Sequence, residues 1–143
     1  MPAWTSNPLT RRLGLAVPIV QGPFGGGLSS VELAAAVSDA GGLGSFGVHH
    51  LDAHGIARVA HDLRAATSRP FALNLWIPHE DADDPPIDDA TFARHVDILR
   101  PYFDELGEPM PQRPARFAPR YAEQVEAVLA ARPAVFSLSL IHI

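Results

Sequence analysis

The chain has 143 residues, of which 47% are hydrophobic and 19% charged, a composition that suggests one folded domain and excludes intrinsic disorder. It contains no cysteine, and all eleven of its basic residues are arginine, which excludes disulfides, thiolate metal sites and Schiff-base catalysis. The net charge is −5 with dispersed arginines, and no apolar run approaches ~18 residues, so we expect neither a nucleic-acid nor a membrane partner. The amino terminus lacks the pattern of a signal peptide, which leaves the cytoplasm as the expected location.

The first half of the chain predicts alternating strands and helices. Apolar runs predict buried strands at residues 17–21, 43–48 and 70–76, whose starts are about 27 residues apart. Amphipathic patterns predict a helix beginning at about Ser30 and a second helix over residues 53–66. Strand–helix–strand units of this length are typical of parallel sheets covered by helices.

Both of these helices have first turns that the sequence predicts. Ser29 is followed three residues later by Glu32, the pattern of a capping box, and Asp52 is a suitable N-cap for the second helix. Both signals place a helix start directly after a strand and a short loop.

The second half is less regular. An acid-rich, solvated loop over residues 77–90 precedes a helical pattern over residues 89–106, with a break predicted at Pro101. A further helix is predicted over residues 119–131, with Val125, Val128 and Leu129 facing inward, and a fourth strand over residues 134–138. Residues 77–133 therefore resemble a loop and helical insertion between the third and fourth strands.

These elements predict an α/β fold with about four parallel strands and covering helices. Such a unit is either a small open sheet or the amino-terminal half of an eight-stranded (β/α)₈ barrel, which usually needs ~250 residues. The half-barrel interpretation has a physical cost, because a sheet opened after four strands exposes an apolar edge that can aggregate.

One glycine motif is a misleading match. Residues 42–47 read Gly-Leu-Gly-Ser-Phe-Gly, which fits the dinucleotide fingerprint literally. In that fingerprint the glycines follow a strand and open a helix, whereas here they follow a helix and run through a strand. We therefore interpret them as glycines of tight helix-to-strand packing.

Two other features suggest a ligand site. Gly22, Pro23 and Phe24 begin a glycine-rich loop after the first predicted strand, where parallel α/β proteins place their ligands. Asn74 lies in the third predicted strand on the opposite face from Leu73 and Leu75, and a buried carboxamide needs partners. Those partners are either the edge of a heterocyclic ligand or a neighbouring loop.

The seven histidines indicate no metal site. His49 and His50 follow the second predicted strand, and the other histidines share no ligand spacing with a carboxylate. We interpret them as surface residues and expect no bound metal.

Four segments together resemble the nitronate monooxygenase family, formerly called 2-nitropropane dioxygenase. They are residues 18–24 (Pro-Ile-Val-Gln-Gly-Pro-Phe), 32–37 (Glu-Leu-Ala-Ala-Ala-Val), 40–45 (Ala-Gly-Gly-Leu-Gly-Ser) and 70–75 (Pro-Phe-Ala-Leu-Asn-Leu). The resemblance extends from about Leu9 to Leu138 and covers only the amino-terminal part of the family. The flavin-dependent enoyl reductases of fatty-acid synthesis are similar over the same strands.

The resemblance implies that residues 1–143 are the truncated amino-terminal half of a (β/α)₈ barrel, which holds FMN at its carboxyl face. Gly22, Pro23 and Phe24 would then lie beside the isoalloxazine ring, and Asn74 would hydrogen-bond the flavin. The family's catalytic histidine and phosphate loops belong to later strands, so the catalytic residue is unknown here. Residues 138–143 depart from the family pattern, and we interpret them as a truncation scar or foreign translated sequence.

The resemblance also implies the reaction. An FMN-dependent oxidoreductase would use O₂ to convert an alkyl nitronate into a carbonyl compound and nitrite, and we expect the 143-residue chain alone to be inactive. Two alternatives stay open, an FMN-dependent enoyl reductase and a non-enzymatic open-sheet binding domain. The oligomeric state and the substrate chain length do not follow from the sequence.

Overall fold

The computed structural model describes residues 3–24, 28–78 and 87–139. The chain divides into two compact units: Met1–His79 joined with Pro119–Ile143, and Glu80–Ala118. The first unit contains the sheet, and the second contains one long helix. None of the helices in the described ranges is long and apolar enough to cross a bilayer.

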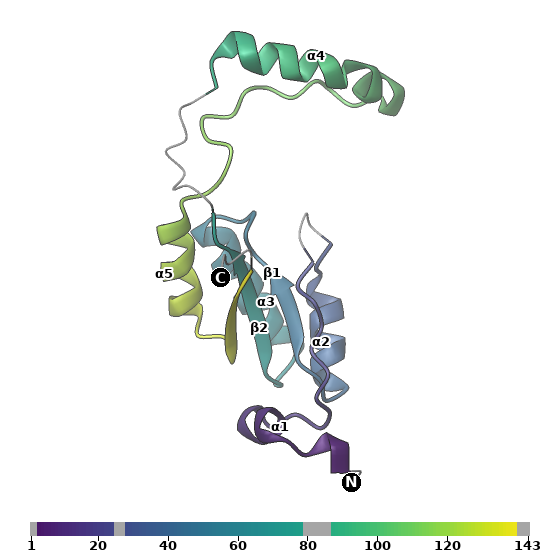
Figure 1. The fold of residues 1–143 in the computed structure, drawn as a ribbon, viewed down its shortest axis with the longest axis vertical. Coiled ribbons are helices and arrows are strands. Elements are labelled where there is room, and N and C mark those ends of the chain that lie inside the picture. The colour runs from purple at the N-terminus through teal and green to yellow at the C-terminus, as the bar shows by residue number, and fades with distance from the viewer. Residues whose placement is uncertain (1–2, 25–27, 79–86, 140–143) are drawn as a thin grey trace. The chain divides into compact units, whose positions relative to one another are not determined.

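Three parallel strands form the sheet of the first unit, in the order β1 (Gly44–Gly47), β2 (Phe71–Trp76) and β3 (Val135–Ser139). Figure 1 shows the strands side by side, with β2 in the middle. The register aligns Gly47 with Asn74, and Asn74 with Ser137. The predicted parallel α/β architecture is thus confirmed for three of the four expected strands.

The prediction of a strand at residues 17–21 is wrong. This segment forms only an isolated parallel bridge between Val20 and Leu43, and Ile19 and Val20 are more than half exposed. Backbone bonds join Leu43 N to Ile19 O and Gln21 N to Leu43 O. Pairing then stops, because the next amide along β1, that of Ser45, donates to the Gln21 side chain instead of to backbone.

Three helices cover one face of the sheet: α2 (Val31–Asp39), α3 (Ala53–Ala66) and α5 (Tyr121–Ala131). The α2 and α3 helices begin where predicted, although the N-cap of α2 is Ser30 rather than Ser29. The predicted inward position of Leu129 on α5 is wrong, because that side chain is exposed. The main core combines the apolar side chains of these helices with alternate residues of β1 and β2. Its buried members are Ala34, Phe46, Val48, Ile56, Ala60, Leu63, Phe71, Leu73, Leu75 and Val128.

A short helix that the sequence reasoning missed, α1 (Pro8–Leu13), follows a 3-10 turn, η1 (Ala3–Thr5). Asn7 and Thr10 form a reciprocal capping box at its start, a signal that is present in the sequence. The chain after α1 packs Leu15 against Leu43 and Ala72, on the face of the sheet that the other helices leave open. This small cluster closes the open face near the amino-terminal ends of the strands.

The second unit holds α4 (Asp89–Leu106), which continues through Pro101 without interruption. The break predicted at Pro101 is wrong. Proline removes one backbone hydrogen bond, but this position is exposed, so water can solvate the carbonyl that loses its donor. Arg113 pairs with Asp89 at 2.6 Å and the Phe92 ring contacts Phe117, so the chain after α4 folds back along it. Most of the predicted acidic loop, residues 79–86, lies outside the described residues.

Candidate functional site

The open face of the sheet changes from apolar to polar along the strands. Phe71, Leu73 and Leu75 share one face of β2, as predicted, and this face lies in the helix-covered core. Ala72 and Asn74 lie on the open face. Ala72 belongs to the apolar cluster near the amino-terminal ends, whereas Asn74 lies one layer further along, beside Ser137. Polar groups therefore gather at the carboxyl end of the sheet, where parallel α/β proteins bind their ligands.

The loop that begins at Gly22 is tied to the end of β1 by one hydroxyl. Ser29 Oγ donates to Phe24 O at 2.9 Å and accepts from Gly47 N at 3.2 Å, and Ser29 is buried. A Cβ on Gly47 would lie 2.7 Å from Phe24 O, so only glycine permits this approach of the loop to the strand. Ser29 was predicted to be part of a capping box, but it holds the loop instead.

Ser29→Ala is expected to release this loop. The Phe24 carbonyl and the buried Gly47 amide would lose their partner, at a cost of about 1–3 kcal/mol in unfolding free energy. Amide hydrogen exchange should become faster at Gly47 and stay unchanged at Leu43, whose amide donates to Ile19 O. If the exchange rate of the Gly47 amide did not change, Ser29 would not be the residue that ties the loop to β1.

Gln21 sits between the loop and β1. Its Oε1 accepts from Ser45 N at 3.4 Å, while its buried Nε2 has no hydrogen-bond partner in the part of the chain that the structure describes. Buried amide groups normally find partners, so this Nε2 is a donor available to a bound molecule. Sequence reasoning did not single out Gln21, because nothing local distinguishes it from a strand-end glutamine.

Asn74 is 1% exposed and satisfied by the neighbouring strand. Its Nδ2 donates to Ser137 Oγ at 2.9 Å and to Ser139 Oγ at 3.0 Å. The sequence left a ligand or a neighbouring loop as possible partners of Asn74, whereas the observed partners are two serines of β3. Asn74 Oδ1 accepts one hydrogen bond, from Ser139 Oγ at 3.3 Å, and an amide oxygen has two lone pairs, so a ligand donor could bind there without breaking these bonds.

Gly47 connects the two predicted parts of the site. It lies against the Phe24 carbonyl and is aligned with Asn74 in the sheet, and Val48 N donates to Asn74 O. The structure thus brings the start of the glycine loop and Asn74 to the same end of the sheet. Residues 25–27 of the loop lie outside the described residues.

His49 is a half-buried residue, which corrects its interpretation as a surface histidine. Its ring stacks on that of Trp76, with centroids 3.7 Å apart and an interplanar angle of 5°. Burial, and secondarily the nearby His50, lower the pKa of His49, which favours the neutral form of its imidazole. His50 is exposed, and no three His, Asp or Glu side chains of the described ranges are grouped to hold a metal ion.

The glycines of residues 42–47 belong to the packing of β1, as interpreted from the sequence. A Cβ on Gly44 would lie 1.9 Å from the Ala34 carbonyl oxygen of α2, so helix and strand touch backbone to backbone. No helix begins after these glycines before Ala53, which removes the helix terminus that a dinucleotide needs.

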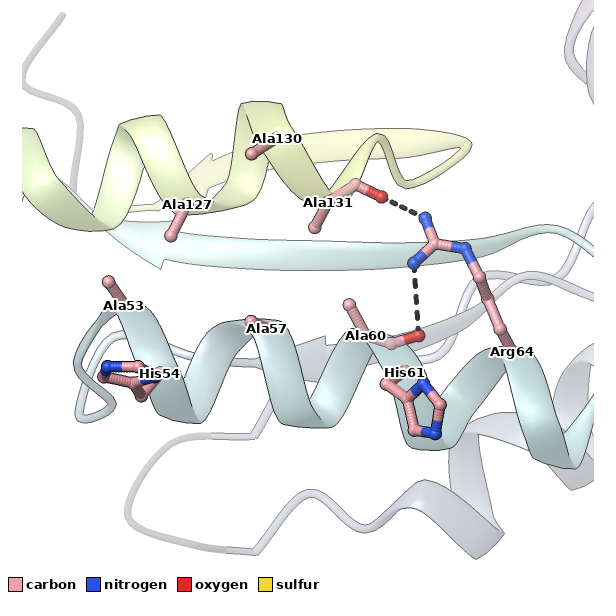
Figure 2. Close-up of a pocket in the computed structure, with 9 residues that line it drawn as sticks. All are labelled: Ala53, His54, Ala57, Ala60, His61, Arg64, Ala127, Ala130 and Ala131. Atoms are coloured by element: carbon pink, nitrogen blue, oxygen red, sulfur yellow. Dashed lines mark hydrogen bonds between the residues drawn. The ribbon is translucent and has the colours of Figure 1, made fainter.

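A groove with a volume of about 500 Å³ lies between α3 and α5. Figure 2 shows alanines from both helices lining it, with Arg64 at one end donating to the carbonyls of Ala60 and Ala131. Because the facing side chains of α3 and α5 are mostly alanines, they do not fill the space between the two helices, and this groove remains. It is separate from the open face of the sheet and contains none of the predicted site residues.

Parallel strands with covering helices, and polar groups gathered at the carboxyl end beside a glycine loop, define an α/β protein of the class that binds ligands at that edge. Residues 6–141 match the family model described as nitronate monooxygenase. The chain belongs to the nitronate monooxygenase family.

Individual relatives agree with this assignment. The chain is 39% identical over 101 residues to the nitronate monooxygenase of Paraburkholderia phytofirmans, covering 71% of this chain and 26% of the relative. It is 38% identical over 104 residues to that of Pseudomonas aeruginosa, covering 73% of this chain and 28% of the relative. The chain thus spans about a quarter of the length of these relatives.

A solved structure matches the fold as well. The nitroalkane oxidase from Streptomyces ansochromogenes superposes with a TM-score of 0.68 at 27% sequence identity, covering 92% of this chain and 35% of that one. The predicted relation to part of a TIM barrel is therefore confirmed.

Proposed function

We propose that this chain provides the first strands of an FMN-dependent enzyme that oxidises alkyl nitronates with O₂ to a carbonyl compound and nitrite. The family match over residues 6–141 is the observation that carries this proposal. The arrangement of the loop and Asn74 around Gly47 supports it, since a ligand at this edge would meet both.

The residues present fit a planar ring with polar edges. A Cβ on Gly22 would meet nothing within 4 Å, so a flat ligand can approach the backbone there. Gly22, Pro23 and Phe24 would lie beside the flavin ring, and the unpartnered Nε2 of Gln21 is a donor on the same side of β1. When bound, FMN would supply an electron acceptor for the electron-rich nitronate.

Asn74 would orient the ring from the neighbouring strand. Because both hydrogens of its Nδ2 are engaged by serines of β3, the amide is held in one orientation before any ligand arrives. The oxygen Oδ1 is therefore a preoriented acceptor, and a preoriented group loses little entropy on binding. Ser137 would therefore act as the residue that positions Asn74.

A chimera tests the function and the role of Asn74 together. Residues 6–137, most of the range matched by the family model, replace the corresponding segment of the Paraburkholderia phytofirmans nitronate monooxygenase, and flavin absorbance and nitronate-dependent O₂ consumption are measured. We expect a flavin-loaded, active chimera, and Asn74→Leu should weaken FMN affinity about tenfold, the value of one good hydrogen bond.

Ser68→Ala is the matched control, because Ser68 is exposed on the loop before β2 and should leave FMN affinity unchanged. A folded chimera that neither binds FMN nor consumes O₂ would contradict the proposed function. Equal FMN affinity in Asn74→Leu would remove Asn74 from the site and leave the function standing.

Two organisational proposals accompany this function. We propose that residues 77–133 form an insertion between β2 and β3 relative to a minimal barrel unit, and that the protein acts in the cytoplasm on a small nitronate substrate. The separation of Glu80–Ala118 as its own compact unit supports the first proposal for that part of the range, whereas α5 belongs to the unit of the sheet. Limited proteolysis cutting first within residues 80–118 is the expected result.

A further inference from the structure

Separate contacts hold the side chain and the backbone of His49. Its ring lies flat on Trp76 at 3.7 Å between centroids. The buried amide of Gln124, on α5, donates to His49 O at 2.8 Å and to Leu51 O at 2.7 Å. The ring and the chain that carries it are therefore fixed by two separate elements.

This fixed ring has an unpartnered nitrogen. His49 Nδ1 is buried and makes no hydrogen bond within the described ranges. Leaving a buried polar atom unpaired costs about 1–3 kcal/mol, and each such atom in a native structure calls for an explanation. The other buried side-chain nitrogen without a partner among the described residues, Gln21 Nε2, also lies next to β1.

The position of His49 relates this nitrogen to the candidate site. His49 follows Gly47 by two residues along the chain, and Trp76 follows Asn74 by two residues on β2. Side chains two apart on a strand share a face, so Trp76 lies one layer beyond Asn74 towards the carboxyl edge. The stacked pair thus borders the open face directly beyond the residues assigned to the cofactor.

We propose that His49 is a substrate-binding residue, whose Nδ1–H donates a hydrogen bond to an oxygen of a planar oxyanion. A neutral imidazole carries one N–H, and a nitronate offers only acceptor oxygens, so the tautomer with the proton on Nδ1 is the one that binds. Identifying the anion as a nitronate rests on the proposed function, whereas the donor site itself does not.

Sodium propanoate is a suitable probe, because a carboxylate holds two anionic oxygens in one plane as a nitronate does and does not react. It is titrated into the 143-residue chain, without flavin, and Trp76 fluorescence is recorded in a Trp4→Phe background that leaves one tryptophan. Sodium chloride at equal ionic strength corrects for non-specific effects. We expect a saturable change with propanoate only.

Three variants separate the nitrogen from the ring. His49→Phe keeps an aromatic ring for Trp76 and should weaken propanoate binding at least about tenfold, as expected for a hydrogen bond to a charged group. His49→Asn places an amide N–H near the position of Nδ1 and should recover most of the affinity. His50→Phe, which alters the adjacent exposed histidine, should bind as the unaltered chain does.

Wild-type affinity in a folded His49→Phe, or no saturable response in the unaltered chain, would overturn the proposal. Should His49→Phe fail to fold, the ¹⁵N shift of His49 Nδ1 in the unaltered chain decides, since it must move when propanoate binds and stay fixed if this nitrogen makes no contact. The titration contains no flavin, so a failure of FMN binding in the chimera would contradict the proposed function without affecting this result.

Discussion

Gly44→Ala is expected to destabilise the first unit by about 3 kcal/mol or more, because the added methyl cannot be accommodated by moving a side chain. The new Cβ would lie 1.9 Å from Ala34 O and 2.6 Å from Ala34 C, both backbone atoms of α2. Relief therefore requires the whole helix to retreat from β1, which opens the core around Ala34 and Phe46. Urea denaturation followed by circular dichroism measures the change.

Gly22→Ala is the matched control for this substitution. The same methyl group at Gly22 would meet nothing within 4 Å, so the free energy of unfolding should change by less than about 0.5 kcal/mol. Equal stability of the two variants would show that α2 does not lie on the backbone of β1 as described.

Ser38→Ala should produce the second large effect, a loss of about 2–4 kcal/mol in unfolding free energy. Ser38 is 1% exposed, and its Oγ donates to Pro70 O at 2.9 Å and accepts from Gly44 N at 3.1 Å. Alanine removes the partner of both backbone groups, and the Gly44 amide is then buried without one. One hydroxyl therefore joins α2 to the starts of two adjacent strands.

The same denaturation experiment on Ser68→Ala provides the comparison, since Ser68 is exposed and should change stability by less than about 0.5 kcal/mol. A Ser38→Ala chain as stable as Ser68→Ala would mean that water replaces the hydroxyl at this junction.

The sequence predicted the elements whose signals are local. Helical periodicity and the Asp52 N-cap located α3, and apolar runs located β1, β2 and β3. The predictions failed where contacts with another segment of the chain decide the local structure. Residues 17–21 have the composition of a strand but form a single bridge, because the Gln21 side chain replaces the backbone as partner of Ser45.

For the candidate site, the sequence located the loop at Gly22 and the strand position of Asn74, since both follow from counting along predicted strands. It did not reveal the role of Ser29, the partners of Asn74 or the stacking of His49 on Trp76. Each of these contacts joins residues from separate segments, and a one-dimensional pattern contains no register between strands.

The amino-acid sequence by itself determined the parallel α/β class, the family resemblance and the face on which Asn74 lies, because alternation and turn chemistry act within a few residues. Only the tertiary structure decided that Ser29 ties Phe24 to Gly47 and that His49 keeps a buried nitrogen without a partner. Those properties depend on how strands and helices pack, and hydrogen bonds between distant segments form only once packing has brought them together.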